Sequence, residues 1–285
     1  MTIAYERIAV PVDGGKLTVG VWGDSGPVVL AVHGITGSHL AWSVVAEQLA
    51  GRARLAAVDL RGRGLSADLP APYGMAAHAA DCVAVLDALR AGSAVVAGHS
   101  MGGFVSLVLG DLRPERVERI VLVDGGPPLP LPAGVEPEEQ LAAVIGPAAT
   151  RLQLRFADRD EYLAYWRGHP AFERWTPAVE AYADYDLTGV APELRSRVST
   201  DAVRDDSVDL YTGDALAGAW ARLRRPTTML RAERGMLDEP TALYSDPAPI
   251  AARIPVRTVP GTNHYTIVFD ETSAAEIAAT LTSRT

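Results

Sequence analysis

The sequence predicts an α/β protein with a mostly parallel sheet, helices on both faces of the sheet, and a helical insertion near the middle of the chain. Short β-branched runs alternate with longer helical stretches through the first 125 residues, as in parallel strands joined by right-handed crossovers. A proline-rich stretch at 125–132 ends this alternation, and sheet-like runs return only near residue 227. With 285 residues, of which 48% are hydrophobic, the chain is long enough to bury the core of such a domain.

The predicted strands of the first half differ in pattern. Two of them, at 8–13 and 16–22, are joined across Gly14 and Gly15, which is a hairpin signal. Continuous apolar runs are typical of strands buried on both faces, and they occur at 28–33, 53–59, 94–98 and 120–124. Between these runs, helices are predicted at about 40–50, 75–90 and 102–112.

The second half completes the sheet around the insertion. Strands are predicted at 227–231 and 256–259, which gives an eight-stranded sheet, and a final helix is predicted at about 272–283. The intervening residues are helical in character and rich in tyrosine and tryptophan. The simplest organisation is a core made of residues 1–125 and 223–285, with residues 126–222 as a helical cap over one end of the sheet.

Composition excludes several classes of function. A net charge of −9 argues against nucleic acid or an anionic membrane surface as a partner. A single cysteine, Cys82, excludes an internal disulfide framework and a cysteine-based zinc site. No basic leader is present, and no apolar run approaches the ~18 residues that span a bilayer. We therefore expect a cytoplasmic protein that acts on a small molecule, and its oligomeric state stays open.

The segment 98–102 reads Gly-His-Ser-Met-Gly and lies between a predicted strand and a predicted helix, which is the context of a nucleophile elbow. A sharp turn there exposes the Ser100 hydroxyl and requires small neighbours. The backbone N–H of Met101, at the start of the helix, would then point toward a carbonyl oxygen under attack. The alternative is a glycine-rich turn in which the serine is incidental.

His264 is the histidine that we expect to act as the base. The chain has six histidines, and a base must reach Ser100 from the same end of the sheet. His264 follows the last predicted strand and precedes the final helical region, which places it at that end. His99 adjoins the nucleophile, but consecutive side chains diverge, so a structural role is expected there. The alternative for His264 is an exposed loop residue.

These motifs resemble the α/β-hydrolase superfamily, and the resemblance extends from the first hairpin to the last helix. The stretches that carry it are 33–37, 59–66, 98–103 and 263–264. It implies the α/β-hydrolase fold and a serine nucleophile, with no metal or organic cofactor. It also implies that His33 and Gly34 lie beside the substrate and that the backbone N–H of Ile35 is the second oxyanion donor.

The acidic residue that orients His264 is harder to assign than the nucleophile Ser100 and the base His264. In most of the superfamily an aspartate follows the seventh strand, but Gly235 stands at that place in this chain. Asp238 follows three residues later and could serve from a longer loop. Asp124 ends the sixth strand and is followed by two glycines, which allow a tight turn. We favour Asp124, and Asp238 is the alternative.

The expected activity is ester hydrolysis of a small, largely apolar substrate through an acyl-enzyme, as in a carboxylesterase. The same groups serve lactonases, thioesterases, C–C bond hydrolases and cofactor-free haloperoxidases, and some proteins with this fold bind a ligand without turnover. Aromatic residues of the insertion, such as Trp166 and Trp175, could line the substrate pocket or hold the insertion on the core.

Overall fold

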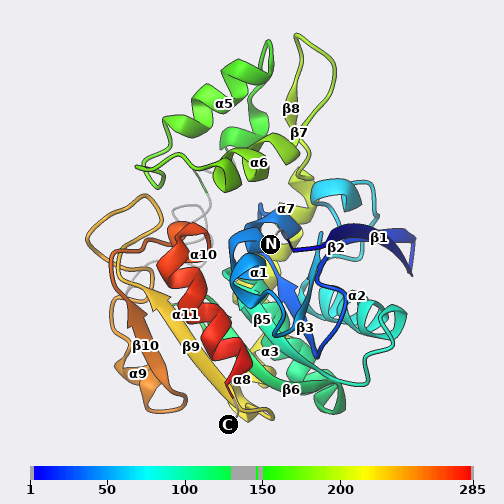
Figure 1. Cartoon of the computed structure of the whole chain (residues 1–285), viewed down its shortest axis with the longest axis vertical. Helices are drawn as coiled ribbons and strands as arrows, with labels where there is room; N and C mark the ends of the chain where they lie inside the picture. Colours follow the sequence, from blue (N-terminus) through cyan, green and yellow to red (C-terminus); the bar gives the residue numbers. More distant parts are fainter. Residues whose placement is uncertain (1–2, 130–145, 147–149, 284–285) are drawn as a thin grey trace.

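The computed structural model describes residues 3–129, 146 and 150–283 and is organised around one eight-stranded sheet (Figure 1). The strands are β1 (Tyr5–Val12), β2 (Gly15–Trp22), β3 (Val28–Val32), β4 (Arg54–Val58), β5 (Ala94–His99), β6 (Val117–Val123), β9 (Thr227–Ala232) and β10 (Val256–Val259). Their order is β1-β2-β4-β3-β5-β6-β9-β10. β2 is antiparallel to both of its neighbours, and all other neighbouring pairs are parallel. The prediction of an eight-stranded, mostly parallel sheet is confirmed.

The order of the strands reverses at β3. β4 follows β3 in the chain and lies on one side of it. β5, which follows β4 in the chain, lies on the other side of β3. The loops that leave β3 and β5 at their carboxyl ends therefore lie next to each other. Open α/β sheets bind ligands at such a switch point.

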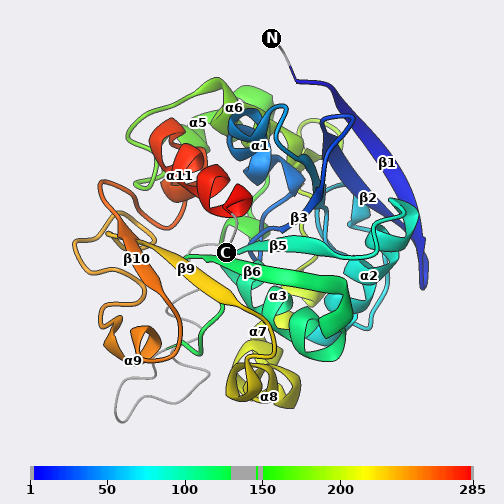
Figure 2. The ribbon, with the colours of Figure 1, turned by 60° about the horizontal axis from the view of Figure 1, so that its bottom comes forward.

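Helices cover both faces of the sheet (Figure 2). One face carries α1 (Ser43–Leu49), the short α10 (Thr266–Phe269) and α11 (Glu271–Thr282), and the other carries α2 (Met75–Ala88), α3 (Met101–Leu112) and α8 (Asp214–Arg222). Short helices at His39–Trp42 (η1), Gly64–Ser66 (η2), Pro114–Arg116 (η3) and Ala248–Ala251 (α9) complete the connections.

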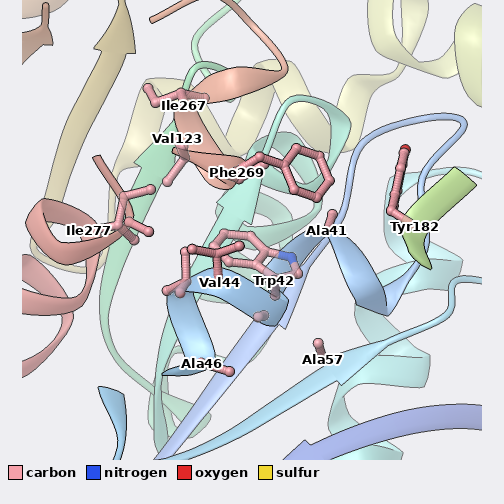
Figure 3. Close-up of a cluster of buried hydrophobic side chains, with 14 of the residues drawn as sticks. Ala41, Trp42, Val44, Ala46, Ala57, Val123, Tyr182, Ile267, Phe269 and Ile277 are labelled. Atoms are coloured by element: carbon pink, nitrogen blue, oxygen red, sulfur yellow. The ribbon is translucent and has the colours of Figure 1, made fainter. Parts of the chain in front are cut away.

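The core is divided between these two faces because successive side chains of a strand point in opposite directions. In β5, Val95 and Ala97 join the cluster under α1 and α11, whereas Val96 joins the cluster under α2 and α3. Figure 3 shows part of the first cluster, where Trp42 lies beside Val44. Burial on both faces explains why the central strands read as continuous apolar runs.

The inserted segment lies beyond the carboxyl ends of the strands. Its elements are α5 (Arg159–Arg167), α6 (Pro177–Tyr185), the two-stranded antiparallel pair β7 (Leu187–Thr188) and β8 (Arg195–Ser196), and α7 (Thr200–Thr212). In Figure 1, α5, α6 and the β7–β8 pair stand above the sheet. The segment is therefore not wholly helical, and residues 130–145 and 147–149 of the expected cap lie outside the described residues.

The division into a core and a cap stays a prediction. Two helices that were assigned to the cap pack against the core helices, since α7 contacts α2 and α8 contacts α3. Leu216 and Ala219 of α8 belong to the same buried cluster as the sheet. Among the described residues, no helix is long and apolar enough to cross a membrane.

Candidate active site

Ser100 stands in the sharp turn between β5 and α3. Its backbone has φ 54° and ψ −124°, a conformation that residues other than glycine rarely adopt. The Ser100 N–H donates to the Val123 carbonyl at 3.0 Å and ties the turn to β6. A Cβ at Gly102 would lie 2.0 Å from the Val32 carbonyl oxygen, so glycine is required where α3 passes β3. The small residues of the motif therefore allow the turn that exposes the serine.

Asp124, directly after β6, is hydrogen-bonded to His264. The His264 Nδ1–H donates to Asp124 Oδ2 at 2.7 Å, and both side chains are buried. The other carboxylate oxygen accepts the Ala232 N–H at 2.9 Å, while the Asp124 N–H donates to the Leu230 carbonyl at 2.8 Å. One hydrogen bond to its side chain and one from its backbone thus hold Asp124 against β9. Because Nδ1 carries the proton, Nε2 of a neutral His264 is left as a base.

Asp238, the alternative acid, has other partners. Its Oδ1 accepts from Arg234 Nε at 2.9 Å and from Asn263 Nδ2 at 3.1 Å. The hydrogen bond from Arg234 is the main reason that the pKa of Asp238 is lowered. The structure therefore brings Asp124, and not Asp238, to His264.

The loop after β3 passes directly beside Ser100. A Cβ at Gly34 would lie 3.0 Å from the Ser100 Cβ and 3.3 Å from its Oγ. Among the described residues, the backbone N–H groups of Ile35 and Met101 have no hydrogen-bond acceptor. The two predicted oxyanion donors are thus available on either side of the Ser100 turn.

His33 holds this loop through hydrogen bonds and is not among the described residues that line the cavity around Ser100. Its Nδ1–H donates to the Gly34 carbonyl at 2.6 Å, and its Nε2 accepts the Leu60 N–H at 3.0 Å. Burial lowers the pKa of His33 to about 4, so the ring is neutral and can fill both roles. Of the two residues that were predicted to lie beside the substrate, Gly34 lines the cavity and His33 is not among its described lining residues.

His99 supports the base through the backbone. Its Nε2–H donates to the His264 carbonyl at 2.7 Å, and the two ring centroids lie 4.9 Å apart. Burial, followed by the nearby His264, lowers the pKa of His99 to about 3. The ring is therefore neutral at ordinary pH and fixes the loop that carries His264.

A narrow cavity of about 70 Å³ opens onto Ser100 and His264. Its wall is mostly apolar and draws residues from α3, α6, α7 and the loops after β3, β9 and β10. The described lining residues that the sequence did not mark as site residues are Thr36, Gly37, Ala41, His99, Phe104, Leu129, Tyr182, Leu210, Tyr211, Met236, Leu243, Tyr265, Val268 and Phe269. Tyr265 follows His264 in the chain and could have been found from that adjacency, whereas nothing in the sequence pattern marks Tyr211.

The two tryptophans that were expected at the substrate do not line this cavity. Trp166 is buried in the aromatic packing of the insertion, with the Arg151 guanidinium 4.9 Å from its ring centroid. Trp175 donates its Nε1–H to Glu180 at 2.8 Å. Both side chains hold the insertion together. Within the described ranges, no group of three or more His, Cys, Asp or Glu residues is placed to hold a metal ion.

Comparison with known proteins gives a consistent result. A model of the α/β hydrolase fold family matches residues 27–269. The chain is 28% identical over 256 residues to 2-(acetamidomethylene)succinate hydrolase from Mesorhizobium japonicum, across 89% of this chain and 87% of the relative. The crystal structure of E-2-(acetamidomethylene)succinate hydrolase superposes with a TM-score of 0.77 at 26% identity, covering 98% of this chain and 99% of the other. Lipase LipV from Mycobacterium tuberculosis is 39% identical over 104 residues, across 36% of this chain and 39% of the lipase.

Proposed function

The chain belongs to the α/β hydrolase fold family, and from that premise we propose that it is a serine hydrolase that cleaves an ester-type bond of a small, largely apolar substrate. The observation that carries the proposal is the 2.7 Å hydrogen bond from His264 to the buried Asp124, beside a serine with φ 54°. This pairing orients the imidazole and stabilises its charged form when it accepts a proton.

The proposed reaction has two steps. In the first, Ser100 Oγ attacks the ester carbonyl while His264 Nε2 removes the hydroxyl proton. The developing oxyanion accepts hydrogen bonds from the N–H groups of Ile35 and Met101. His264 then gives its proton to the leaving alcohol. In the second step His264 activates a water molecule, which releases the acid and restores Ser100.

The apolar wall of the cavity supports a substrate with an apolar acyl part. Phe104, Leu243 and Phe269 line the space around Ser100, and none of the described lining residues is Arg or Lys. Such a wall favours a neutral hydrocarbon group over a charged one. The relative from Mesorhizobium japonicum is named for hydrolysis of 2-(acetamidomethylene)succinate, and that compound is a reasonable second substrate to assay.

Serine-directed labelling and ester turnover test the proposal together. A fluorophosphonate should label wild-type protein once and should leave the Ser100→Ala variant unlabelled. Turnover of p-nitrophenyl esters of graded chain length should fall at least about a thousandfold in Ser100→Ala. The matched control is Ser93→Ala, which removes an exposed serine hydroxyl that bonds Glu118 and should behave like wild type.

Two results would contradict the proposal. Unchanged esterase activity in Ser100→Ala would remove the serine from the mechanism. Absence of turnover by wild-type protein across the ester series, with lactones, thioesters and 2-(acetamidomethylene)succinate also inert, would favour a ligand-binding protein of the same fold.

A further inference from the structure

Tyr211, in the last turn of α7, lines the cavity around Ser100. Its hydroxyl oxygen is buried and has no hydrogen-bond partner among the described residues. A buried hydroxyl without a partner is unfavourable, and native proteins leave few of them. Such an atom in the wall of a binding cavity is accounted for if the ligand supplies the missing partner.

Three titratable side chains beside Ser100 already have hydrogen-bond partners within the protein. Asp124 and His264 are bonded to each other, and His99 donates to the His264 carbonyl. Other buried groups that lack partners, such as Trp42 Nε1 and Trp166 Nε1, do not line this cavity. Among the described residues that line the cavity, Tyr211 is the one whose side chain has a buried polar atom without a hydrogen-bond partner.

Tyr211 is available as a hydrogen-bond donor. Burial raises the pKa of its phenol, so the hydroxyl keeps its proton at neutral pH. Leu210, Met236 and Leu243 line the same cavity, and their side chains offer no oxygen or nitrogen acceptor. The complementary ligand group is an oxygen acceptor carried on an otherwise apolar chain.

The helix that carries Tyr211 is firmly attached to the core. Asp206 of α7 accepts the Gly74 N–H at 2.6 Å and pairs with Arg63 at 2.5 Å. One turn later, Asp209 accepts the Met75 N–H at 2.6 Å. These contacts fix α7 against the start of α2 just before Tyr211. A polar group on a rigid element discriminates between ligands better than one on a free loop.

We propose that Tyr211 is a specificity-determining residue, and that the substrate carries a ketone or hydroxyl oxygen within its apolar acyl chain, away from the bond that is cleaved. This inference rests on the proposed serine hydrolase function. A site built to hydrogen-bond such an oxygen disfavours the analogue that lacks it, because the Tyr211 hydroxyl is then left without a partner. The same cavity without Tyr211 would select by chain length alone.

The test compares p-nitrophenyl esters of straight-chain acids with chain-matched keto esters, in which one methylene at each successive position is replaced by a carbonyl. For at least one position, wild-type protein should give a kcat/KM for the keto ester about tenfold or more above the plain ester. In Tyr211→Phe this ratio should fall to about one. The control Tyr73→Phe removes a hydroxyl that bonds the Leu69 carbonyl outside the cavity, and it should keep the wild-type ratio.

Thermal unfolding supplies a second measurement. Because Tyr211→Phe removes a hydroxyl that has no partner, its Tm should equal or exceed that of wild type. A clear fall in Tm would mean that the hydroxyl has a structural partner and would overturn the inference. A keto preference that is absent in wild type at every position, or that persists in Tyr211→Phe, would overturn it as well.

Binding to a Ser100→Ala background separates this inference from the proposed function. Calorimetry should show tighter binding of the favoured keto ester than of its plain counterpart, and adding Tyr211→Phe should abolish the difference. If wild type turns over no ester but this binding preference is present, the proposed function fails and the inference stands. If wild type hydrolyses plain esters but no preference depends on Tyr211, the inference alone fails.

Discussion

At the residue scale, both oxygens of the Asp124 carboxylate have defined partners. One accepts from His264 Nδ1 at 2.7 Å and the other from the Ala232 N–H at 2.9 Å. The strand β9 thus fixes the plane of the carboxylate, and the carboxylate in turn fixes which nitrogen of His264 is protonated. Orientation of the His264 ring therefore depends on a hydrogen bond from the backbone of β9 to the Asp124 carboxylate.

The Asp124→Asn variant should fold but lose most of its activity. The asparagine oxygen can still accept the Ala232 N–H, which turns the amide nitrogen toward His264 Nδ1. An N–H facing Nδ1 forces the imidazole proton onto Nε2, where the base is needed. Ester turnover should drop on the order of 10³–10⁴-fold, with the circular dichroism spectrum unchanged.

The control for this prediction is Asp238→Asn. Asp238 is paired with Arg234 and Asn263, so its loss should change kcat by no more than a few-fold. The opposite pattern, with near-normal turnover in Asp124→Asn and a large loss in Asp238→Asn, would transfer the role of the acid to Asp238.

At the scale of elements, the elbow depends on how closely α3 approaches the sheet. The first turn of this helix passes β3 without room for a side chain, and Gly125 lies equally close to the Ser100 backbone. A Cβ at Gly125 would lie 2.2 Å from the Ser100 carbonyl oxygen. The strained conformation of Ser100 is therefore enforced by its neighbours on both sides.

The Gly102→Ala variant should be unstable and poorly active. Its Cβ would lie 2.0 Å from the Val32 carbonyl oxygen, and the backbone of a central strand cannot move aside. α3 would have to shift and carry Ser100 with it. We expect the free energy of unfolding to fall by about 3 kcal/mol in chemical denaturation, together with a lower kcat.

The matched control is Gly92→Ala, because a Cβ at Gly92 meets no atom within 4 Å. That variant should be as stable as wild type or slightly more stable, since alanine restricts the unfolded chain. Equal stability of Gly102→Ala and wild type would mean that the close approach of α3 to β3 is not required.

At the scale of the whole molecule, the inserted segment is joined to the core by contacts near the site. The Tyr185 hydroxyl donates to Asp59 Oδ2 at 2.6 Å, and Asn263, beside His264, donates its Nδ2–H to the Ala171 carbonyl at 2.9 Å. Phe172 packs against Phe269, with ring centroids 6.1 Å apart. These contacts place the insertion and the His264 loop in one packed unit.

Stability of the whole molecule should fall in mild acid. His33 and His99 are buried and neutral, with pKa values lowered to about 4 and about 3, chiefly by burial. In the unfolded chain both titrate near pH 6.5, so the unfolded state binds more protons as the pH falls below that value. The stability that they contribute is complete above pH 6.5 and is lost as the pH falls toward their folded-state pKa values.

Denaturant unfolding at pH 7 and pH 5 measures this effect. Each histidine should reduce the free energy of unfolding by about 2 kcal/mol at pH 5 relative to pH 7. In His99→Gln the difference between the two pH values should shrink by about that amount, whatever the stability of the variant at pH 7. A wild-type stability that is flat between pH 7 and pH 5 would contradict the assignment of neutral, buried histidines.

The fold was predictable because its signals are local. Continuous apolar runs mark central strands, and the motif around Ser100 marks a strand-to-helix turn, so neither requires knowledge of distant contacts. The acid was harder to assign, because Asp124 and Asp238 both follow strands that end at the same edge of the sheet. The role of the tryptophans stayed open in the sequence, because composition does not distinguish aromatic residues that line a cavity from those that pack a core.

The sequence by itself determined the class of fold, and it was sufficient to propose Ser100 as the nucleophile and His264 as the base, since each of these inferences depends on neighbouring residues in the chain. Only the tertiary structure decided which carboxylate meets His264, because Asp124 is 140 residues away in sequence and is brought there by the order β6-β9-β10 in the sheet. The cavity wall was likewise decided by packing, which places Tyr211 of α7 and Tyr182 of α6 around Ser100. Short-range sequence patterns determine helices and strands. A site that is assembled from several strand ends and helices depends instead on how those helices and strands pack together.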